Sequence, residues 1–390
     1  MGVRARGLSG SGRLWRRAVV TADVAVVGGG VIGLAVAEEL ARAGHRVVVL
    51  ERDRVGSSCA AAAAAGMLAP AAEADTTPEV TTQLALQSHR MYPEWVARLE
   101  ASSGVQVGLD RSGTVMVALD ADDLRELVHL EQAQRRFGLR TQRLSGGEAR
   151  KMQPSLGPSV VGGLLLADDW QVDPRRLLQA LRRSAELAGG RVLEGVEVQA
   201  LRRQDGSWRV GVRGGEDLAA RRVVVAAGAW TPFVLPAELP RPPLRPVRGV
   251  VLRLGSGLES SHVVRTPRVY VVPRRWGETV VGATVEERGW AREALAGGVY
   301  ELLRESRRAL PCVDEMPLRE VAVGFRPAIR DNVPAIGAVD EEGTLFVATG
   351  HYRKGVELAP LTAAMLRQQL EGGRHPMADA VDPRRFAVVE

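Results

Sequence analysis

The first part of the chain predicts a strand, a helix and a second strand in succession. Residues 23–27, an aspartate followed by a short apolar run rich in valine, are typical of a buried parallel strand. Residues 35–43 have a helical composition, and Gly44 stands where a C-terminal helix cap belongs. A second apolar run at 46–50 ends at Glu51. The pattern therefore predicts a βαβ unit, the building block of sheets with parallel strands.

Apolar runs of the same kind return much later in the chain. Residues 221–225 and 345–350 each predict a buried strand that ends in small residues, and a helix is expected to follow at 356–370. The sheet is therefore expected to be assembled from separated stretches of chain. The predicted fold class is α/β, and α+β in part, with a Rossmann-like sheet at its centre.

The stretches in between predict a second unit, as the length of 390 residues also suggests. Asp173 and Pro174 are typical of a helix start, and the helical stretch that they begin ends before Gly189. Another helical stretch lies at 122–137. Alternating or β-branched patterns predict antiparallel strands at 250–254, 269–272 and 278–285. Such strands can form a sheet that covers a bound cofactor.

The net charge of +6 does not indicate a nucleic-acid binder, because it comes from one end of the chain. Residues 1–22 contain five arginines and no acidic residue, which leaves +1 for the remainder. A nucleic-acid binder is expected to carry its basic stripe on the fold itself. We interpret residues 1–18, rich in Gly, Ser and Arg, as a flexible tail. A targeting signal is the alternative, although its apolar segment would then be the first strand.

The sequence lacks the signals of several classes of protein. The two cysteines, Cys59 and Cys312, form no CxxC pair, so neither a zinc site nor a disulfide framework is indicated. No uncharged apolar run reaches the length of a membrane helix. The sequence contains no HExxH, GxSxG or Walker A motif. We therefore expect a cytoplasmic protein without a metal site.

Residues 28–33 contain the glycine fingerprint GxGxxG between the first strand and the first helix. Gly28 permits the tight turn, Gly30 lets the backbone approach a pyrophosphate, and Gly33 allows the helix to pack on the strand. The helix N-terminus offers free N–H groups to phosphates. Glu51 is placed to accept hydrogen bonds from an adenosine ribose. This acid favours FAD or NAD over NADP, and the unit alone does not decide between the first two.

The rest of the chain favours the flavin through a resemblance. Its motifs are the GGGVIG turn, the AAAAGMLAP run ending at Pro70, YVVPRR at 270–275, VGATVE at 281–286, GFRP at 324–327 and GHYRKG at 350–355. With these motifs, residues 22–372 resemble the D-amino-acid-oxidase-type superfamily of FAD-dependent oxidoreductases, and within it the glycine oxidases of thiamine biosynthesis. The alanine run lacks the hydroxyl residue that is usual in the family. A hydrogen bond to the pyrophosphate is then either missing or supplied by Ser57 or Ser58.

The resemblance implies a non-covalent FAD. Related sarcosine oxidases hold the flavin through a cysteine in a region that Gly324 and Phe325 occupy here. The helix at 356–370 is expected to face the electron-rich end of the flavin and to stabilise its reduced anion. The cofactor-binding residues implied are Gly28, Gly30, Val31, Ile32, Gly33, Glu51, Arg52, Ala60, Ala61, Ala65, Gly66, Met67, Val198, Gly228, His351, Tyr352, Arg353, Lys354, Gly355, Val356 and Glu357.

An amino-acid substrate needs a partner for its carboxylate, and Arg326 is the first candidate. A guanidinium matches a carboxylate with two parallel hydrogen bonds, and the following proline favours an extended backbone at this residue. The resemblance points to the same arginine and adds Arg353. Tyr270 is expected to donate its hydroxyl to the same carboxylate, or alternatively to be only a half-buried aromatic of the sheet. Met67 is expected to line the pocket, with core packing as the alternative.

The reaction that the resemblance implies is FAD-dependent oxidation of glycine, and of small amines such as sarcosine or D-alanine. Hydride transfer to flavin N5 needs only a neutral substrate amine, so no catalytic base is expected and His351 is assigned to the cofactor. Oxygen would accept the electrons and yield H2O2, while the imine product would feed thiazole synthesis or hydrolyse to glyoxylate. The alternatives are a D-amino-acid or sarcosine dehydrogenase that passes electrons to a quinone, and a flavin-bound scaffold without activity.

The expected domain division follows from these assignments. A flexible basic tail is expected at 1–21 and a C-terminal tail at 373–390. The FAD-binding domain is expected at 22–85, 150–235 and 321–372, and the substrate domain at 86–149 and 236–320. The resemblance further implies a homo-oligomer that acts on a small amino acid and O2, with no nucleic-acid partner and no membrane span.

Overall fold

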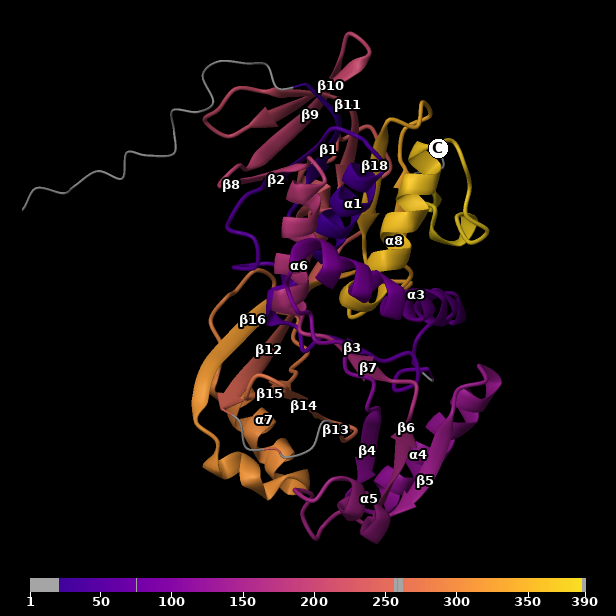
Figure 1. Ribbon diagram of the computed structural model, residues 1–390, viewed down its shortest axis with the longest axis vertical. Coiled ribbons are helices and arrows are strands. Elements are labelled where there is room, and N and C mark those ends of the chain that lie inside the picture. Colours follow the sequence, from indigo (N-terminus) through magenta and orange to yellow (C-terminus); the bar gives the residue numbers. More distant parts are fainter. Residues whose placement is uncertain (1–20, 75, 256–257, 259–261, 388–390) are drawn as a thin grey trace, which may run out of the picture.

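The structure is a computed structural model that describes residues 21–74, 76–255, 258 and 262–387. In these residues two large sheets lie one above the other in Figure 1, with the short pair β3 (Met67–Leu68) and β7 (Trp170–Gln171) between them. The upper sheet is largely parallel and the lower sheet largely antiparallel. This architecture confirms the predicted α/β fold with a second, antiparallel unit.

The centre of the upper sheet consists of the strands that the apolar runs predict. β1 (Thr21–Val27) pairs in parallel with β2 (Val47–Glu51) on one side and with β11 (Leu218–Val225) on the other. β18 (Leu345–Thr349) extends the sheet beyond β11, and β8 (Arg191–Glu194) extends it beyond β2. Strands that are far apart in the sequence therefore lie side by side, as predicted.

Both faces of the upper sheet are covered. On one face, apolar side chains of four helices pack against β1, β2 and β11. On the other face, the hairpin of β9 (Val198–Gln204) and β10 (Ser207–Val212) closes a second core. The helices are α1 (Val31–Arg42), α3 (Glu79–Ser103), α6 (Pro174–Leu187) and α8 (Gly355–Leu370). The first turn of α1 and the first turn of α8 are thereby fixed near the ends of parallel strands.

Helix α6 begins as its sequence predicts, whereas α3 was not predicted. The Asp173 carboxylate accepts hydrogen bonds from the backbone N–H groups of Arg175 and Arg176. In α3, apolar side chains recur at helical spacing and enter the core with α6 and α8. Residues 86–103, expected in the substrate domain, therefore pack with the helices of the upper sheet.

The lower sheet contains the three antiparallel strands that were predicted near 250, 270 and 280. Its strand order is β16-β12-β15-β14-β13-β4-β6-β5. The sheet includes residues 162–166 and 318–328, which the expected boundaries at 150 and 321 placed wholly or partly with the FAD-binding domain. The strands are β4 (Thr114–Ala118), β5 (Thr141–Ser145), β6 (Gly162–Leu166), β12 (Arg245–Gly255), β13 (Val263–Arg265), β14 (Tyr270–Arg274), β15 (Glu278–Gly282) and β16 (Leu318–Ala328).

Alternation along these strands gives the lower sheet two different faces. Helix α7 (Ala296–Ala309) packs on one face, where Val250, Leu252 and Val281 are fully buried. Val251 and Val280 point to the opposite face, where they contact the alanine-rich segment that follows β2. The remaining helices beside this sheet are α4 (Ala121–Arg136) and α5 (Gly146–Met152).

The C-terminal segment is packed on the fold in the part that the structure describes. Val381 is fully buried in the helix-side core of the upper sheet. Arg385 forms an ion pair with Asp331 at 3.1 Å. β17 (Ala335–Ala338) lies at this edge, antiparallel to β18. Residues 373–387, the described part of the expected C-terminal tail, therefore pack on the fold, and residues 1–20 of the basic tail lie outside the described part of the chain.

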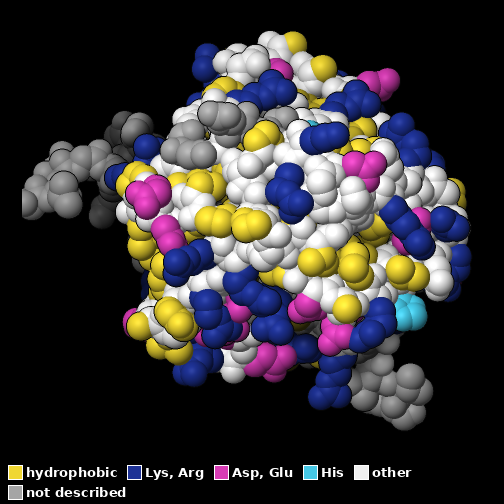
Figure 2. All heavy atoms as spheres, turned by 90° about the horizontal axis from the view of Figure 1, so that it is seen from below, with side chains coloured by type: hydrophobic (Ala, Val, Ile, Leu, Met, Phe, Trp, Pro, Cys, Tyr) yellow, Lys and Arg dark blue, Asp and Glu magenta, His cyan; other side chains and the backbone are white. Residues whose placement is uncertain are grey.

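The surface agrees with a nearly neutral folded part. Figure 2 shows basic side chains spread over one face of the molecule, with acidic and apolar side chains between them. None of the helices formed by the described residues combines the length and the apolar character that crossing a membrane requires.

Candidate active site

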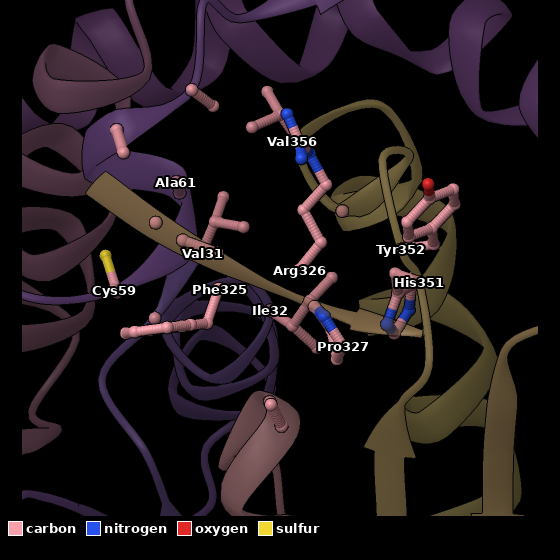
Figure 3. A pocket seen from close by; sticks show the side chains of 18 of the residues that line it. Val31, Ile32, Cys59, Ala61, Phe325, Arg326, Pro327, His351, Tyr352 and Val356 are labelled. Carbon is pink, nitrogen blue, oxygen red and sulfur yellow. The ribbon is translucent and has the colours of Figure 1, made fainter. Parts of the chain in front are cut away.

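A cavity of about 690 Å³ is lined by residues of both sheets and by the first turns of α1 and α8. Its volume is within the usual range of cofactor and small-molecule sites. Apart from Gly33 and the alternative donor Ser57, every residue that the sequence analysis assigned to cofactor or substrate lines this cavity. Figure 3 shows Arg326 on β16, with Cys59 and Ala61 to one side and His351 and Tyr352 to the other. The fold thus brings stretches that are distant in the sequence to one place.

The glycine fingerprint forms the tight turn between β1 and α1. Gly28 has a φ of 107°, and a Cβ atom there would stand 2.6 Å from the carbonyl oxygen of Ala226. A Cβ atom at Gly33 would overlap the carbonyl of Gly28, so this glycine serves the packing of α1 rather than the cavity lining. Gly30 is the N-cap of α1 and has no side chain. The N–H groups of the first turn are therefore accessible to a phosphate group.

Glu51 lies at the end of β2, beside the turn. Its carboxylate accepts hydrogen bonds from the backbone N–H of Gly29 at 2.6 Å and of Asp53 at 2.9 Å. The neighbouring Arg52 lies with its Cζ 4.7 Å from the centroid of the Trp230 ring. A carboxylate can accept more than two hydrogen bonds, so Glu51 remains suited to the ribose hydroxyls that the sequence analysis assigned to it.

Arginines hold the alanine run against the lower sheet. Arg175 and Arg253 both donate to the carbonyl of Ala62, at 2.9 and 3.0 Å, and Arg274 donates to the carbonyl of Ala65. Without side chains beyond Cβ, the segment can lie close to a flat ring. Arg253 and Arg274 are buried and Arg175 is half-buried. The two bonds to Ala62 satisfy a carbonyl that the short helix α2 (Ala60–Ala63) leaves free.

The two serines before the alanine run differ in position. Ser58 lines the cavity, and its hydroxyl donates to Asp53 at 2.5 Å. Ser57 donates to the carbonyl of Arg54 and is not part of the lining. Of the two, Ser58 is therefore placed to substitute for the missing hydroxyl of the family.

Arg326 has a guanidinium without a carboxylate partner among the described residues. It is half-buried on β16 and donates to the carbonyl oxygens of Arg248 at 3.2 Å and Thr284 at 3.1 Å. Its guanidinium lies over Gly249 of the neighbouring strand β12. No acidic side chain of the described chain forms an ion pair with it. The cavity thus contains a fixed positive group that can accept an anion.

Tyr270 lies near Arg326 on the same side of the lower sheet. A Cβ atom at Gly282 would stand 2.5 Å from its hydroxyl oxygen, so the ring lies over the glycine that pairs with it on β15. Burial raises the pKa of Tyr270, and the positive charges of Arg326 and Arg265 partly oppose this rise. The phenol is therefore protonated at neutral pH and is able to donate a hydrogen bond.

Glu73 is the main residue of the cavity that the sequence analysis missed. Its carboxylate lies 3.3 Å from Arg265, 3.3 Å from Lys354 and 3.6 Å from Arg353. Burial acts to raise the pKa of Glu73, but these cations hold it well below its usual range. A sequence signal was available, because residues 55–72 contain no charge and Glu73 ends that stretch.

The first turn of α8 contains a buried charged network. Lys354 donates to the carbonyl of Ala69 at 2.9 Å and forms an ion pair with Glu357 at 2.9 Å. Burial acts to lower the pKa of Lys354, but Glu357 and Glu73 raise it, so the amine stays charged. Burial raises the pKa of the nearby Asp169 to about 7. The side chains of Lys354 and Glu357, predicted to bind the cofactor, thus bind one another.

His351 and Met67 also line the cavity. The His351 ring lies 3.0 Å from the Thr362 hydroxyl, and burial lowers its pKa to about 3. The imidazole is therefore neutral at any ordinary pH. Met67 is half-buried on β3 and packs beside Tyr270 and Val251. Both positions agree with lining roles, and the neutral, hydrogen-bonded ring gives no support to a catalytic base.

These features together fit a dinucleotide cofactor with a flat ring system. A side chain at residue 28 would fill the turn, so the glycine keeps it open for a ligand. The first turn of α1 has free N–H groups, and the alanine run leaves room beside the lower sheet. Arg326 on β16 and Tyr270 on β14 line the same cavity from the lower sheet.

Comparisons with known proteins show the family of the chain. The family model described as FAD dependent oxidoreductase (DAO) matches residues 23–369. A glycine oxidase of Geobacillus kaustophilus (strain HTA426) is 34% identical over 352 residues, which cover 90% of this chain and 93% of the relative. The crystal structure of glycine oxidase from Geobacillus kaustophilus matches with a TM-score of 0.87 at 32% identity, covering 95% of this chain and 99% of that one.

A second group of relatives is longer. The bifunctional protein ThiO/ThiG of Synechocystis sp. (strain ATCC 27184 / PCC 6803 / Kazusa) is 35% identical over 376 residues, which cover 94% of this chain and 54% of the relative. This chain therefore spans about half the length of these bifunctional relatives.

Proposed function

Because this chain belongs to the family of FAD dependent oxidoreductases, we propose that it oxidises the amine of a small amino acid. Glycine is the first substrate proposed, with sarcosine and D-alanine as further ones. The observation that carries the proposal is Arg326, a cavity guanidinium that has only carbonyl partners among the described residues. The glycine oxidases among the relatives support the choice of amino acid.

The residues of the upper sheet are proposed to hold FAD without a covalent bond. The turn at Gly28 and the first turn of α1 bind the pyrophosphate, Glu51 binds the ribose, and the alanine run lies beside the flavin ring. Bound FAD supplies the electron acceptor for the oxidation. The first turn of α8 adds free N–H groups at the flavin end, which favour a negative charge.

Arg326 and Tyr270 are proposed to bind the substrate carboxylate, with Arg353 beside them. The guanidinium gives two hydrogen bonds and the phenol a third, and the three donors fix the amine and Cα on one side of the cavity. No protein base is required, because the substrate reacts in the form whose own amino group is neutral. Positioning by these donors is therefore the main contribution of the chain to the rate.

The electron acceptor is proposed to be O2, with H2O2 as product, and a quinone is the alternative. The imine product would hydrolyse to glyoxylate and ammonia, or enter thiazole synthesis as the resemblance to the glycine oxidases of thiamine biosynthesis implies. The FAD-loaded protein is incubated with glycine in air, and H2O2 and glyoxylate are measured. A parallel reaction under nitrogen contains a soluble quinone instead.

Equal yields of H2O2 and glyoxylate in air support the oxidase. Turnover only with the quinone would assign the protein to the dehydrogenases. If neither reaction occurs with glycine, sarcosine or D-alanine, the proposed function is wrong.

A further inference from the structure

We propose that the substrate end of the cavity has a second anion site at Arg265, and that its preferred substrates are amino acids with a second carboxylate. The inference rests on the proposed function and specifies its substrate class. In this arrangement Arg326 binds the α-carboxylate, and Arg265 binds the carboxylate at the far end of the side chain.

The charge balance of the described lining is the first observation. Besides Glu51, Arg52 and Glu197, which lie at or beside the end of β2, the lining contains five basic residues and two acidic ones. One of the two, Glu357, forms its ion pair with Lys354 inside the fold. Arg268 pairs with Glu305 at 3.9 Å, and Glu305 does not line the cavity. Glu73 and Glu357 balance two of the other four cations, so a substrate with a single carboxylate leaves one positive charge unbalanced. The basic residues are Arg265, Arg268, Arg326, Arg353 and Lys354, and the acidic residues are Glu73 and Glu357.

Arg265 has an unused donor, which is the second observation. Its side chain is 16% exposed, and one terminal nitrogen, Nη2, lies 3.3 Å from Glu73. The other terminal nitrogen, Nη1, is buried without a hydrogen-bond partner among the described residues. A buried guanidinium N–H without an acceptor is costly, and a bound carboxylate would supply that acceptor.

The sheet register places Arg265 where a substrate side chain can reach it. Arg265 on β13 pairs directly with Tyr270 on β14, and Tyr270 pairs with Gly282 on β15. The phenol lies over Gly282 and is influenced by the charges of both Arg326 and Arg265. The phenol of Tyr270 therefore lies between two cationic groups, Arg326 and Arg265. When the α-carboxylate of an amino acid is bound by Arg326 and Tyr270, its side chain can extend toward Arg265.

The test compares acidic D-amino acids with their neutral amides, which have nearly the same shape. The FAD-loaded protein is assayed with D-aspartate against D-asparagine and with D-glutamate against D-glutamine. The wild type is expected to show a kcat/KM at least tenfold higher for the acid in one of the pairs. In Arg265→Gln this acid-to-amide ratio of kcat/KM is expected to fall to about one. Because both values are measured in the same protein, any general loss of activity in the variant lowers both and leaves the ratio unchanged.

The control is Arg275→Gln, an exposed arginine of the β14–β15 turn that does not line the cavity. It removes the same charge and is expected to keep the ratio. A second measurement requires no turnover: succinate and butyrate are titrated into the FAD-loaded protein, and the change in flavin absorbance gives their Kd. Succinate is expected to bind at least tenfold more tightly than butyrate, and Arg265→Gln to remove the difference.

The outcomes separate this inference from the proposed function. If glycine or D-alanine is oxidised but the acid-to-amide ratios are near one in the wild type, the second site does not exist and the proposed function stands. If succinate binds more tightly in an Arg265-dependent manner but no amino acid is oxidised, the anion site stands and the proposed function fails. Equal effects of Arg265→Gln and Arg275→Gln would show that only net charge matters, which also overturns the second site.

Discussion

The guanidinium of Arg326 occupies the space that a side chain at Gly249 would need. A Cβ atom at 249 would stand 2.6 Å from Cζ of Arg326. We therefore predict that Gly249→Ala displaces the guanidinium and raises KM for glycine at least tenfold. Bound FAD is expected to be retained, because neither residue belongs to the nucleotide turn. Steady-state kinetics and the flavin absorbance per protein measure both effects.

A matched control for this variant is Gly297→Ala. Gly297 lies in α7, and a Cβ atom there would meet nothing within 4 Å. Its kinetics are expected to equal those of the wild type. Unchanged KM in Gly249→Ala would mean that the position of the guanidinium does not decide substrate binding.

Replacing the arginine itself tests its role directly. Arg326→Ala is expected to raise KM for glycine about a hundredfold, because it removes the donors to the carboxylate, a loss of about 3 kcal/mol of binding. Arg326→Lys keeps the charge but loses the planar fork, so its KM for glycine is expected to lie between that of the wild type and that of Arg326→Ala. Normal glycine kinetics in Arg326→Ala would contradict the assignment of the carboxylate.

Glu73→Gln is expected to destabilise the fold by a few kcal/mol at neutral pH, because three cations lose their shared partner. The pKa of Glu73 is lowered in the folded state, so its contribution is present above about pH 4.5 and is lost as pH falls below that value. Denaturant unfolding between pH 3.5 and 7 should therefore show a shallower acid slope for the variant. Glu79→Gln, an exposed acid of α3, serves as the control; equal curves for all three proteins would refute the network.

Asp169→Asn is expected to have the opposite pH dependence. Burial raises the pKa of Asp169 from 3.8 to about 7, so the wild type loses stability as pH rises through this window. The variant has no such proton to lose, and its stability relative to the wild type should increase from pH 4 to pH 7 and then level off. The shift sets an upper limit of about 4 kcal/mol for this gain. A pH-independent difference would show that Asp169 does not titrate in this range.

Much of the upper sheet could be predicted because its signals are local. The strand that ends at Val27, the turn at Gly28 and the acid at Glu51 lie within one short stretch, and the helix start at Asp173 is a capping signal. The antiparallel strands of the lower sheet were found by their alternation. The need of an amino-acid substrate for a carboxylate partner indicated Arg326 and Tyr270, the motif resemblance pointed to the same arginine, and the structure places both residues in one cavity.

The missed features depend on contacts that are distant in sequence. α3 has a weak apolar pattern and a proline at 93, and its burial becomes clear only once α6 and α8 are placed. The network at Glu73 depends on Arg265 and Arg353, which are 192 and 280 residues away. The unused donor of Arg265 is likewise a property of three-dimensional packing, which no spacing along the chain encodes.

Mixing glycine with the FAD-loaded protein in the absence of oxygen, and following the flavin absorbance, shows whether the protein oxidises an amino acid. We expect rapid bleaching by glycine, and rapid recovery with release of H2O2 when air is admitted. Slow recovery in air would favour the quinone-linked alternative. A flavin that stays oxidised with glycine, sarcosine and D-alanine would contradict the account.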